Sequence, residues 1–144
     1  MATAYKIGEM NELNTAIYGT LSGGTALTSL LAGTTSIYHL QAPDNADLPY
    51  VVFNIQAGGD ENQTPKRRKN YVMYIRAYSE TSAANAGSID AQVDTLLHGK
   101  TLSVSGWANF WCNREQDFDM IENLQSGEKI WMQGGLYRVR LEKV

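Results

Sequence analysis

The chain has 144 residues, of which 43% are hydrophobic, 10% aromatic and 19% charged, and its formal net charge is −3. This length predicts a single domain over residues 1–144 that needs neither disulfides nor a structural metal. The single cysteine, Cys112, can complete neither an internal disulfide nor a four-ligand metal site. The charge argues against wholesale nucleic-acid binding, and without a long apolar run or a signal peptide we expect a soluble protein from a reducing compartment.

Two helices are predicted at the N-terminus. Apolar residues within 7–21 recur at intervals of three, four or one, which places them on one face of a helix. Gly23 and Gly24 favour its end, because glycine readily adopts the left-handed conformation found there. A shorter helical turn follows, capped by Thr25 and stopped by Gly33.

Two strands are predicted next, after a short extended stretch over residues 36–40. The first, 48–55, is rich in β-branched and aromatic residues. The second, 71–78, has few polar side chains on either face, so we expect both faces to be covered, by helices or by another subunit. The segment between them, 58–70, is predicted to be a long loop.

One further helix and a set of strands complete the predicted domain. Residues 80–98 carry a narrow apolar stripe of helical period that ends at Gly99. Further strands are predicted over residues 101–104, 107–114 and 129–143. This order favours an α+β fold: an antiparallel or mixed β-sheet with the N-terminal helix pair and the middle helix packed on one face.

Three local features of the C-terminal half carry separate expectations. Residues 116–129 are predicted to form a second long loop. Gly134–Gly135 indicates either a bulge or a two-residue hairpin turn inside the last strand. Simple alternation divides the strand at 107–114 into two faces, with Ala108, Phe110 and Cys112 on one and Trp107, Asn109 and Trp111 on the other.

No catalytic or metal-binding set can be assembled from the sequence. His39 and His98 are each better explained as structural, since a lone histidine without a ligand-spaced partner rarely forms a site. Cys112 is expected to be a buried, unreactive thiol. The acidic run over residues 115–122 lacks the glycine and ligand spacing of a calcium loop and fits a solvated hairpin tip. We therefore expect no enzyme activity, no cofactor and no metal.

The sharpest local signal is a basic run formed by Lys66, Arg67, Arg68 and Lys69. One interpretation is a solvated loop whose charges discourage pairing at a sheet edge. The other is a contact with an acidic partner or a DNA backbone, because several cations together neutralise phosphates without reading sequence. The second interpretation would make the chain a small nucleic-acid-binding module.

Aromatic residues exceed what one small core needs. The chain has three tryptophans and eight tyrosines, most of them in predicted strands that alternate imperfectly, so some of them must lie outside the core. Exposed aromatic patches usually mark protein interfaces. The candidate subunit-interface residues are Tyr74, Tyr78, Trp107, Trp111 and Trp131. Assembly is therefore favoured over catalysis.

Several segments together resemble a known family. The most specific are the strand Leu-Pro-Tyr-Val-Val-Phe at 48–53 and the helix end Leu-Leu-His-Gly at 96–99. Together with the N-terminal helix pair and the alternating final strand at 137–141, they resemble the tail-completion or tail-terminator proteins of long-tailed bacteriophages. This group also includes tail-to-head joining proteins.

The resemblance implies a virion structural protein of the tail or neck region that is assembled in the host cytoplasm. It implies a ring, typically a homohexamer, that caps the tail tube, stops its polymerisation and docks to the head connector. DNA would pass through this ring without sequence-specific contact, and no membrane would be involved. A basic run lining the bore would hinder DNA sliding, so we expect residues 66–69 to lie outward or between rings. The alternatives are a head-completion or neck subunit, a tail-tube subunit, or the nucleic-acid-binding module.

Overall fold

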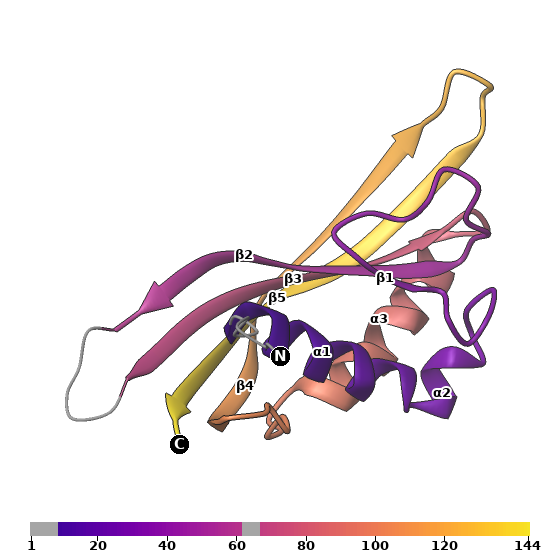
Figure 1. Cartoon of the computed structure of the whole chain (residues 1–144). Coiled ribbons are helices and arrows are strands. Elements are labelled where there is room, and N and C mark those ends of the chain that lie inside the picture. Colours follow the sequence, from indigo (N-terminus) through magenta and orange to yellow (C-terminus); the bar gives the residue numbers. More distant parts are fainter. Residues whose placement is uncertain (1–8, 62–66) are drawn as a thin grey trace, which may run out of the picture.

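The computed structural model describes residues 9–61 and 67–144. Within these ranges the helices are α1 (Glu9–Ser22), α2 (Thr25–Thr28) and α3 (Ala83–Leu97). The strands are β1 (Ile37–His39), β2 (Tyr50–Asp60), β3 (Arg68–Ser79), β4 (Trp107–Asn123) and β5 (Lys129–Lys143). The helices lie together on one face of the sheet (Figure 1), which confirms the predicted α+β class.

The five strands form one mixed sheet in the order β1-β2-β3-β5-β4. β1 runs parallel to β2, and all other neighbours are antiparallel. β3 pairs with β5 along its whole length, from Arg68 opposite Glu142 to Ser79 opposite Trp131. The β4–β5 hairpin extends beyond the other strands at one end of the sheet, and the β2–β3 hairpin extends at the other end (Figure 1). In this order β4 is an edge strand.

The two long loops predicted over 58–70 and 116–129 are wrong at 58–60 and 68–70 and at 116–123, which are parts of strands, whereas residues 62–66 lie outside the described residues. β2 continues through Gly58 and Gly59 to Asp60, and β3 already begins at Arg68. Likewise, β4 runs to Asn123, and only residues 124–128 connect it to β5. These segments have the composition of turns, but a partner strand lies opposite each of them and provides the backbone hydrogen bonds. The hydrogen bonds between paired strands outweigh the weak preference of these residues for turns.

Both interpretations of the glycine pair in the last strand are also wrong. Gly134 and Gly135 run straight through β5 and are paired on both sides, with β3 and with β4. The irregularity lies on β4, between Arg114 and Gln116. The glycines leave room for their neighbours, because a Cβ atom at Gly135 would lie 2.6 Å from the Arg114 guanidinium carbon.

A second irregularity in β4, between Asn109 and Trp111, changes which side chains face the core. Simple alternation therefore fails at Phe110, which is 43% exposed, whereas Cys112 is fully buried. Trp107, predicted on the face opposite Cys112, is 4% exposed and joins the same core. The predicted division of this strand into two faces is wrong because of the bulge.

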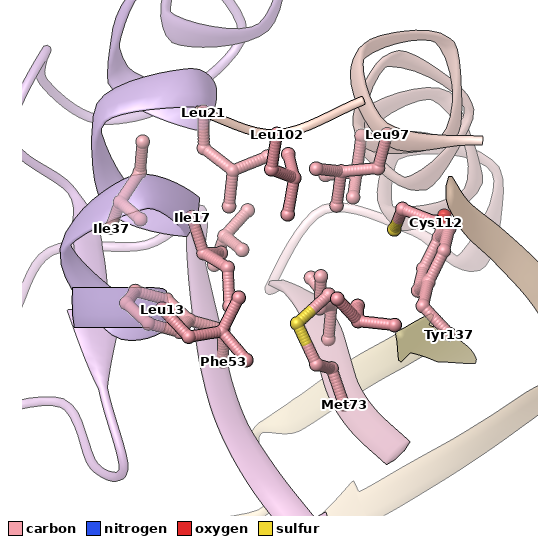
Figure 2. Packing of buried hydrophobic residues seen from close by; sticks show 14 of the residues in the cluster. Leu13, Ile17, Leu21, Ile37, Phe53, Met73, Leu97, Leu102, Cys112 and Tyr137 are labelled. Carbon is pink, nitrogen blue, oxygen red and sulfur yellow. The ribbon is translucent and has the colours of Figure 1, made fainter. Parts of the chain in front are cut away.

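The core lies between the helices and the sheet (Figure 2), and we call this side of the sheet the inner face. The predicted stripe of α1 is confirmed for Leu13, Ile17 and Leu21, which are fully buried against the inner face, whereas Met10 and Tyr18 of the same stripe are exposed. Every second residue of β3 is buried there too, from Tyr71 to Ala77. The alternate residues of β3 are half-buried on the opposite side, which we call the outer face. The outer face has no layer of described helices over it (Figure 1).

Candidate functional site

A row of aromatic rings crosses the outer face. Tyr38 of β1 meets Tyr50 of β2 edge-on, with ring centroids 5.7 Å apart. Tyr50 in turn packs against Tyr78 of β3 at 5.3 Å. Tyr74, also on β3, contacts Phe118 of β4 edge-on at 4.4 Å. These five rings, together with the arginine that lies between Tyr74 and Tyr78, are named the aromatic row.

The arginine at the centre of the aromatic row is Arg76. Its guanidinium carbon lies 4.7 Å from the Tyr74 ring centroid and 5.8 Å from that of Tyr78, within the range of cation–π contacts. Nη1 donates to the Tyr78 hydroxyl at 3.1 Å, and Nη2 makes a long contact of 3.4 Å with Oδ1 of Asn54. Nε is buried and has no acceptor among the described residues.

Arg76 differs from the other arginines of the chain. The other five form salt bridges, in the pairs Arg67–Asp60, Arg68–Glu142, Arg114–Asp90, Arg138–Glu115 and Arg140–Glu61. Within residues 9–61 and 67–144, Arg76 has no carboxylate partner. A cleft of about 340 Å³ opens beside it, and Asp44 and Glu122 contribute to its lining without bonding to the guanidinium.

Tyr50 and Tyr78 of the aromatic row stay protonated at neutral pH. Burial raises the pKa of Tyr50, and neighbouring groups such as Tyr78 and Glu122 raise it further. Burial also raises the pKa of Tyr78, although Arg76 opposes the change. Their hydroxyls therefore carry no charge that would neutralise Arg76.

On the inner face, Arg114 of β4 joins α3 to the sheet. Its Nη1 and Nη2 donate to the two carboxylate oxygens of Asp90 at 2.9 and 2.7 Å, and Nε donates to Asp117. Nη1 also donates to the Tyr137 hydroxyl at 3.0 Å, which in turn donates to Asp94 at 3.1 Å. Burial lowers the pKa of Arg114, but these hydrogen bonds, led by those with Asp90, raise it overall. Arg114 is a charged and fully engaged structural residue.

An acidic groove of about 760 Å³ lies over Arg114, between α3 and β4. Its lining includes Glu115, which pairs with Arg138, and four aspartates, and we use the name acidic groove for the aspartates together with Arg114: Asp90, Asp94, Asp117 and Asp119. Asp119 is exposed and forms no ion pair with any residue that the structure describes. The groove therefore carries an excess of negative charge, with Asp119 as its least engaged carboxylate.

The end of the β4–β5 hairpin exposes apolar side chains on both faces. Met120, which is 61% exposed, lies opposite Met132 on the outer face. Ile121, which is 46% exposed, lies opposite the partly exposed Trp131 on the inner face. Ile121 is two residues after Asp119, so both side chains are on the same side of β4. Exposed apolar groups of this size are typical of a contact surface.

The basic run is mostly paired with acidic side chains. Lys66 lies outside the described residues. Arg67 and Lys69 both contact the Asp60 carboxylate, at 2.7 and 3.1 Å, and Arg68 contacts Glu142 at 3.0 Å. Hydrogen bonds from Arg67 and Lys69 hold the pKa of Asp60 well below its usual range. Arg68 and Lys69 are part of β3 rather than of a loop, which corrects that part of the prediction.

The five predicted interface residues occupy different parts of the molecule. Tyr74 and Tyr78 are brought together in the aromatic row. Trp111 is half-buried beside Arg140, at 6.0 Å, and Trp131 lies on the hairpin. Trp107 packs in the chain's own core and offers no surface, because the bulge in β4 turns it inward. Its place in the interface prediction is therefore corrected.

Sequence reasoning missed the other members of the aromatic row. Period-two alternation shows that Arg76 shares a face with Tyr74 and Tyr78. The partners Tyr50 and Phe118 depend on strand register, since Tyr50 lies opposite Tyr78 and Phe118 lies two strands away from Arg76, across Gly134. No local pattern contains that information.

The remaining candidates are structural. His39 packs against Phe53 at 5.3 Å, and Nδ1 of His98 accepts the Arg114 backbone N–H at 3.0 Å. Burial raises the pKa of the Cys112 thiol to about 12, which confirms the expected unreactive thiol. Within the described ranges, no group of three or more His, Cys, Asp or Glu side chains could hold a metal ion. None of the described helices is long and apolar enough to cross a membrane.

Comparisons with known proteins give one family and one fold. The family model for tail completion protein gp17 matches residues 15–133, a range that contains the aromatic row and the acidic groove. A chain from a structure titled "Virion of native gene transfer agent (GTA) particle" has a similar fold, with a TM-score of 0.78 and 18% identity over 95% of this chain and 99% of that chain. The comparison with curated proteins finds no match. Because the family model covers most of its length, this chain belongs to the tail completion protein gp17 family, a family of phage tail structural proteins.

Proposed function

We propose that this tail structural protein is a tail terminator. Copies of the chain assemble into a ring, typically of six, that caps the end of the tail tube and stops its polymerisation. The same ring offers the surface to which the head connector docks, and DNA passes through its bore. The family membership supports the setting, and the surfaces of the subunit support the assembly.

The observation that carries the proposal is the difference between the two faces of the sheet. The outer face presents aromatic rings around a cation, whereas the inner side of the β4–β5 hairpin presents carboxylates followed by Ile121 of β4 and its neighbour Trp131 of β5. Two unlike surfaces on one subunit favour a heterologous contact, in which one surface binds the other surface of the next copy. Such contacts close into a ring when the rotation between neighbours allows it, and otherwise they continue as a filament.

The salt bridges of the basic run support the proposal that DNA passes through the ring without binding tightly to it. Arg67, Arg68 and Lys69 are engaged by Asp60 and Glu142, so the phosphate-binding capacity of this part is reduced. This is the reason to prefer the structural role over a nucleic-acid-binding module.

Light scattering of the purified protein, alone and mixed with tail tubes, tests the proposal. A terminator gives a defined oligomer and binds tube ends, where electron microscopy places one ring per tube. A protein that stays monomeric and never binds tube ends would contradict the proposal. Labelling along the tube would indicate a tube subunit, and labelling only at the collar of assembled particles would indicate a neck subunit.

A further inference from the structure

The guanidinium of Arg76 has more hydrogen-bonding capacity than the chain satisfies. An arginine carries five N–H donors, and here the acceptors within reach are the Tyr78 hydroxyl and, at 3.4 Å, Asn54. The half-buried charge lies among aromatic rings, where water screens it less than at an open surface. A carboxylate is the acceptor that matches it best.

The carboxylates that the structure describes do not supply this acceptor. Asp44 and Glu122 line the cleft beside Arg76, but neither forms an ion pair with it. Asp119 belongs to the opposite face of the same sheet, because it neighbours Phe118, whose ring is part of the aromatic row. A contact between Asp119 and Arg76 therefore requires two copies.

The two surfaces match in pattern as well as in charge. Arg76 has an aromatic ring on either side, Tyr74 and Tyr78. Asp119 is followed on the same face by Ile121, which lies opposite Trp131. When the two surfaces meet, the Arg76 guanidinium and the Asp119 carboxylate pair with apolar groups around both. Apolar groups around a charged pair exclude water from it, as at the centre of a protein interface.

We propose that Arg76 of one copy binds Asp119 of the next copy, so that the inner side of one β4 strand lies on the aromatic row of its neighbour. This inference deepens the proposed function and rests on it, because it names the contact that builds the ring. A two-fold symmetric use of the aromatic row is disfavoured, since it would bring the Arg76 side chains of both copies together. Contacts of this front-to-back kind have a direction and repeat around a ring.

Two charge reversals test the contact, with native mass spectrometry and analytical ultracentrifugation as readouts. Arg76→Glu places a second carboxylate against Asp119, and Asp119→Arg places a second guanidinium against Arg76. We expect each single variant to weaken self-association by at least about 30-fold, the range for losing one partner of a close interfacial charge pair. The double variant, Arg76→Glu with Asp119→Arg, restores the oligomer.

Mixing the two single variants gives a sharper result. Each protein repels itself, but the introduced carboxylate of the first attracts the introduced guanidinium of the second. The natural Arg76 of the second likewise attracts the natural Asp119 of the first. We expect an oligomer with an even number of subunits in which the two proteins alternate in equal amounts. A variant that had lost its fold would not be rescued by mixing, so rescue separates a broken contact from a broken subunit.

Asp119→Asn and Glu122→Gln form a matched pair on the same hairpin. Both remove one negative charge, but Glu122 lies on the cleft side of the sheet and Asp119 in the acidic groove. We expect weaker assembly only for Asp119→Asn. Equal effects in the two variants, or absence of rescue in the mixture, would overturn the contact. A wild-type protein that fails to form any oligomer, alone or on tube ends, would overturn the ring itself, whereas an oligomer insensitive to Arg76→Glu would overturn only this inference.

Discussion

Arg76 and Arg114 lie on opposite faces of the same sheet and have opposite surroundings. Arg114 is engaged by carboxylates of α3 and β4 and by a tyrosine hydroxyl. Arg76 contacts aromatic rings and has no carboxylate partner among the described residues. An arginine's partners, more than its burial, therefore separate a residue that holds the fold together from one available to a second molecule.

Arg114→Met should have the largest effect on the subunit alone. It leaves Asp90, whose side chain is only 13% exposed, without its counter-charge, and removing one member of a buried ion pair costs about 3–5 kcal/mol. Urea unfolding of Arg114→Met and of Arg76→Met, followed by circular dichroism, compares the two arginines directly. Equal losses in the free energy of unfolding would contradict the distinction between them.

Gly134→Ala should destabilise the subunit by about 1–3 kcal/mol, because the added methyl group overpacks the sheet at the residue that lies opposite Arg76 and is hydrogen-bonded to Arg114. The Gly134 carbonyl accepts from Arg114 at 2.9 Å, and an added Cβ would lie 2.2 Å from the Ile75 carbonyl oxygen and 2.9 Å from the Phe118 ring. Gly59→Ala is the matched control, since Gly59 is also in a strand but an added Cβ meets nothing within 4 Å. Thermal unfolding checks both variants; a smaller loss at Gly134 than at Gly59 would be inconsistent with the packing described.

Arg76→Met should change the free energy of unfolding by only about 1–2 kcal/mol, the range of a partly desolvated cation–π contact. Self-association should nevertheless weaken, because the methionine keeps the apolar contacts but loses the charge. Urea unfolding of the dilute monomer, set beside sedimentation of the concentrated protein, separates the two effects. A variant that loses stability but assembles normally would place Arg76 among the structural residues.

The smallest expected effect is on the stability of the fold at acidic pH, to which the Asp60 carboxylate contributes. Its pKa is lower in the folded chain than in the unfolded chain, so its ionised form stabilises the fold above the unfolded value of about 3.8. This contribution is lost as the pH falls below that value and through the lower folded pKa. Asp60→Asn should therefore make unfolding between about pH 4 and pH 2 less steeply dependent on pH. An unchanged pH profile would show that the pairing with Arg67 and Lys69 is too weak to matter in solution.

The sequence predicts the elements better than their edges and contacts. The stripe of Leu13, Ile17 and Leu21 identifies α1 because helical periodicity is a local property. Gly134–Gly135 has the local composition of a turn, yet its role is to make room for Arg114 and Phe118, which are distant in the sequence.

The candidate site shows the same division between local and distant information. Tyr74 and Tyr78 could be proposed from excess aromatic content and alternation. The lack of a carboxylate partner for Arg76 among the described residues could not, because it depends on where the carboxylates lie in the folded chain. The bulge that buries Trp107 is equally invisible in a strict period of two.

The buried thiol has a practical consequence for mapping neighbours. Cys112 is the chain's only cysteine, and with its pKa raised to about 12 it is almost entirely protonated and shielded at neutral pH. Any cysteine introduced on the surface is then the only thiol that a maleimide reagent will modify. Fluorophores or bifunctional linkers can be attached at one chosen position of the natural sequence, so the order and spacing of copies in an assembled particle can be measured without first removing a native cysteine.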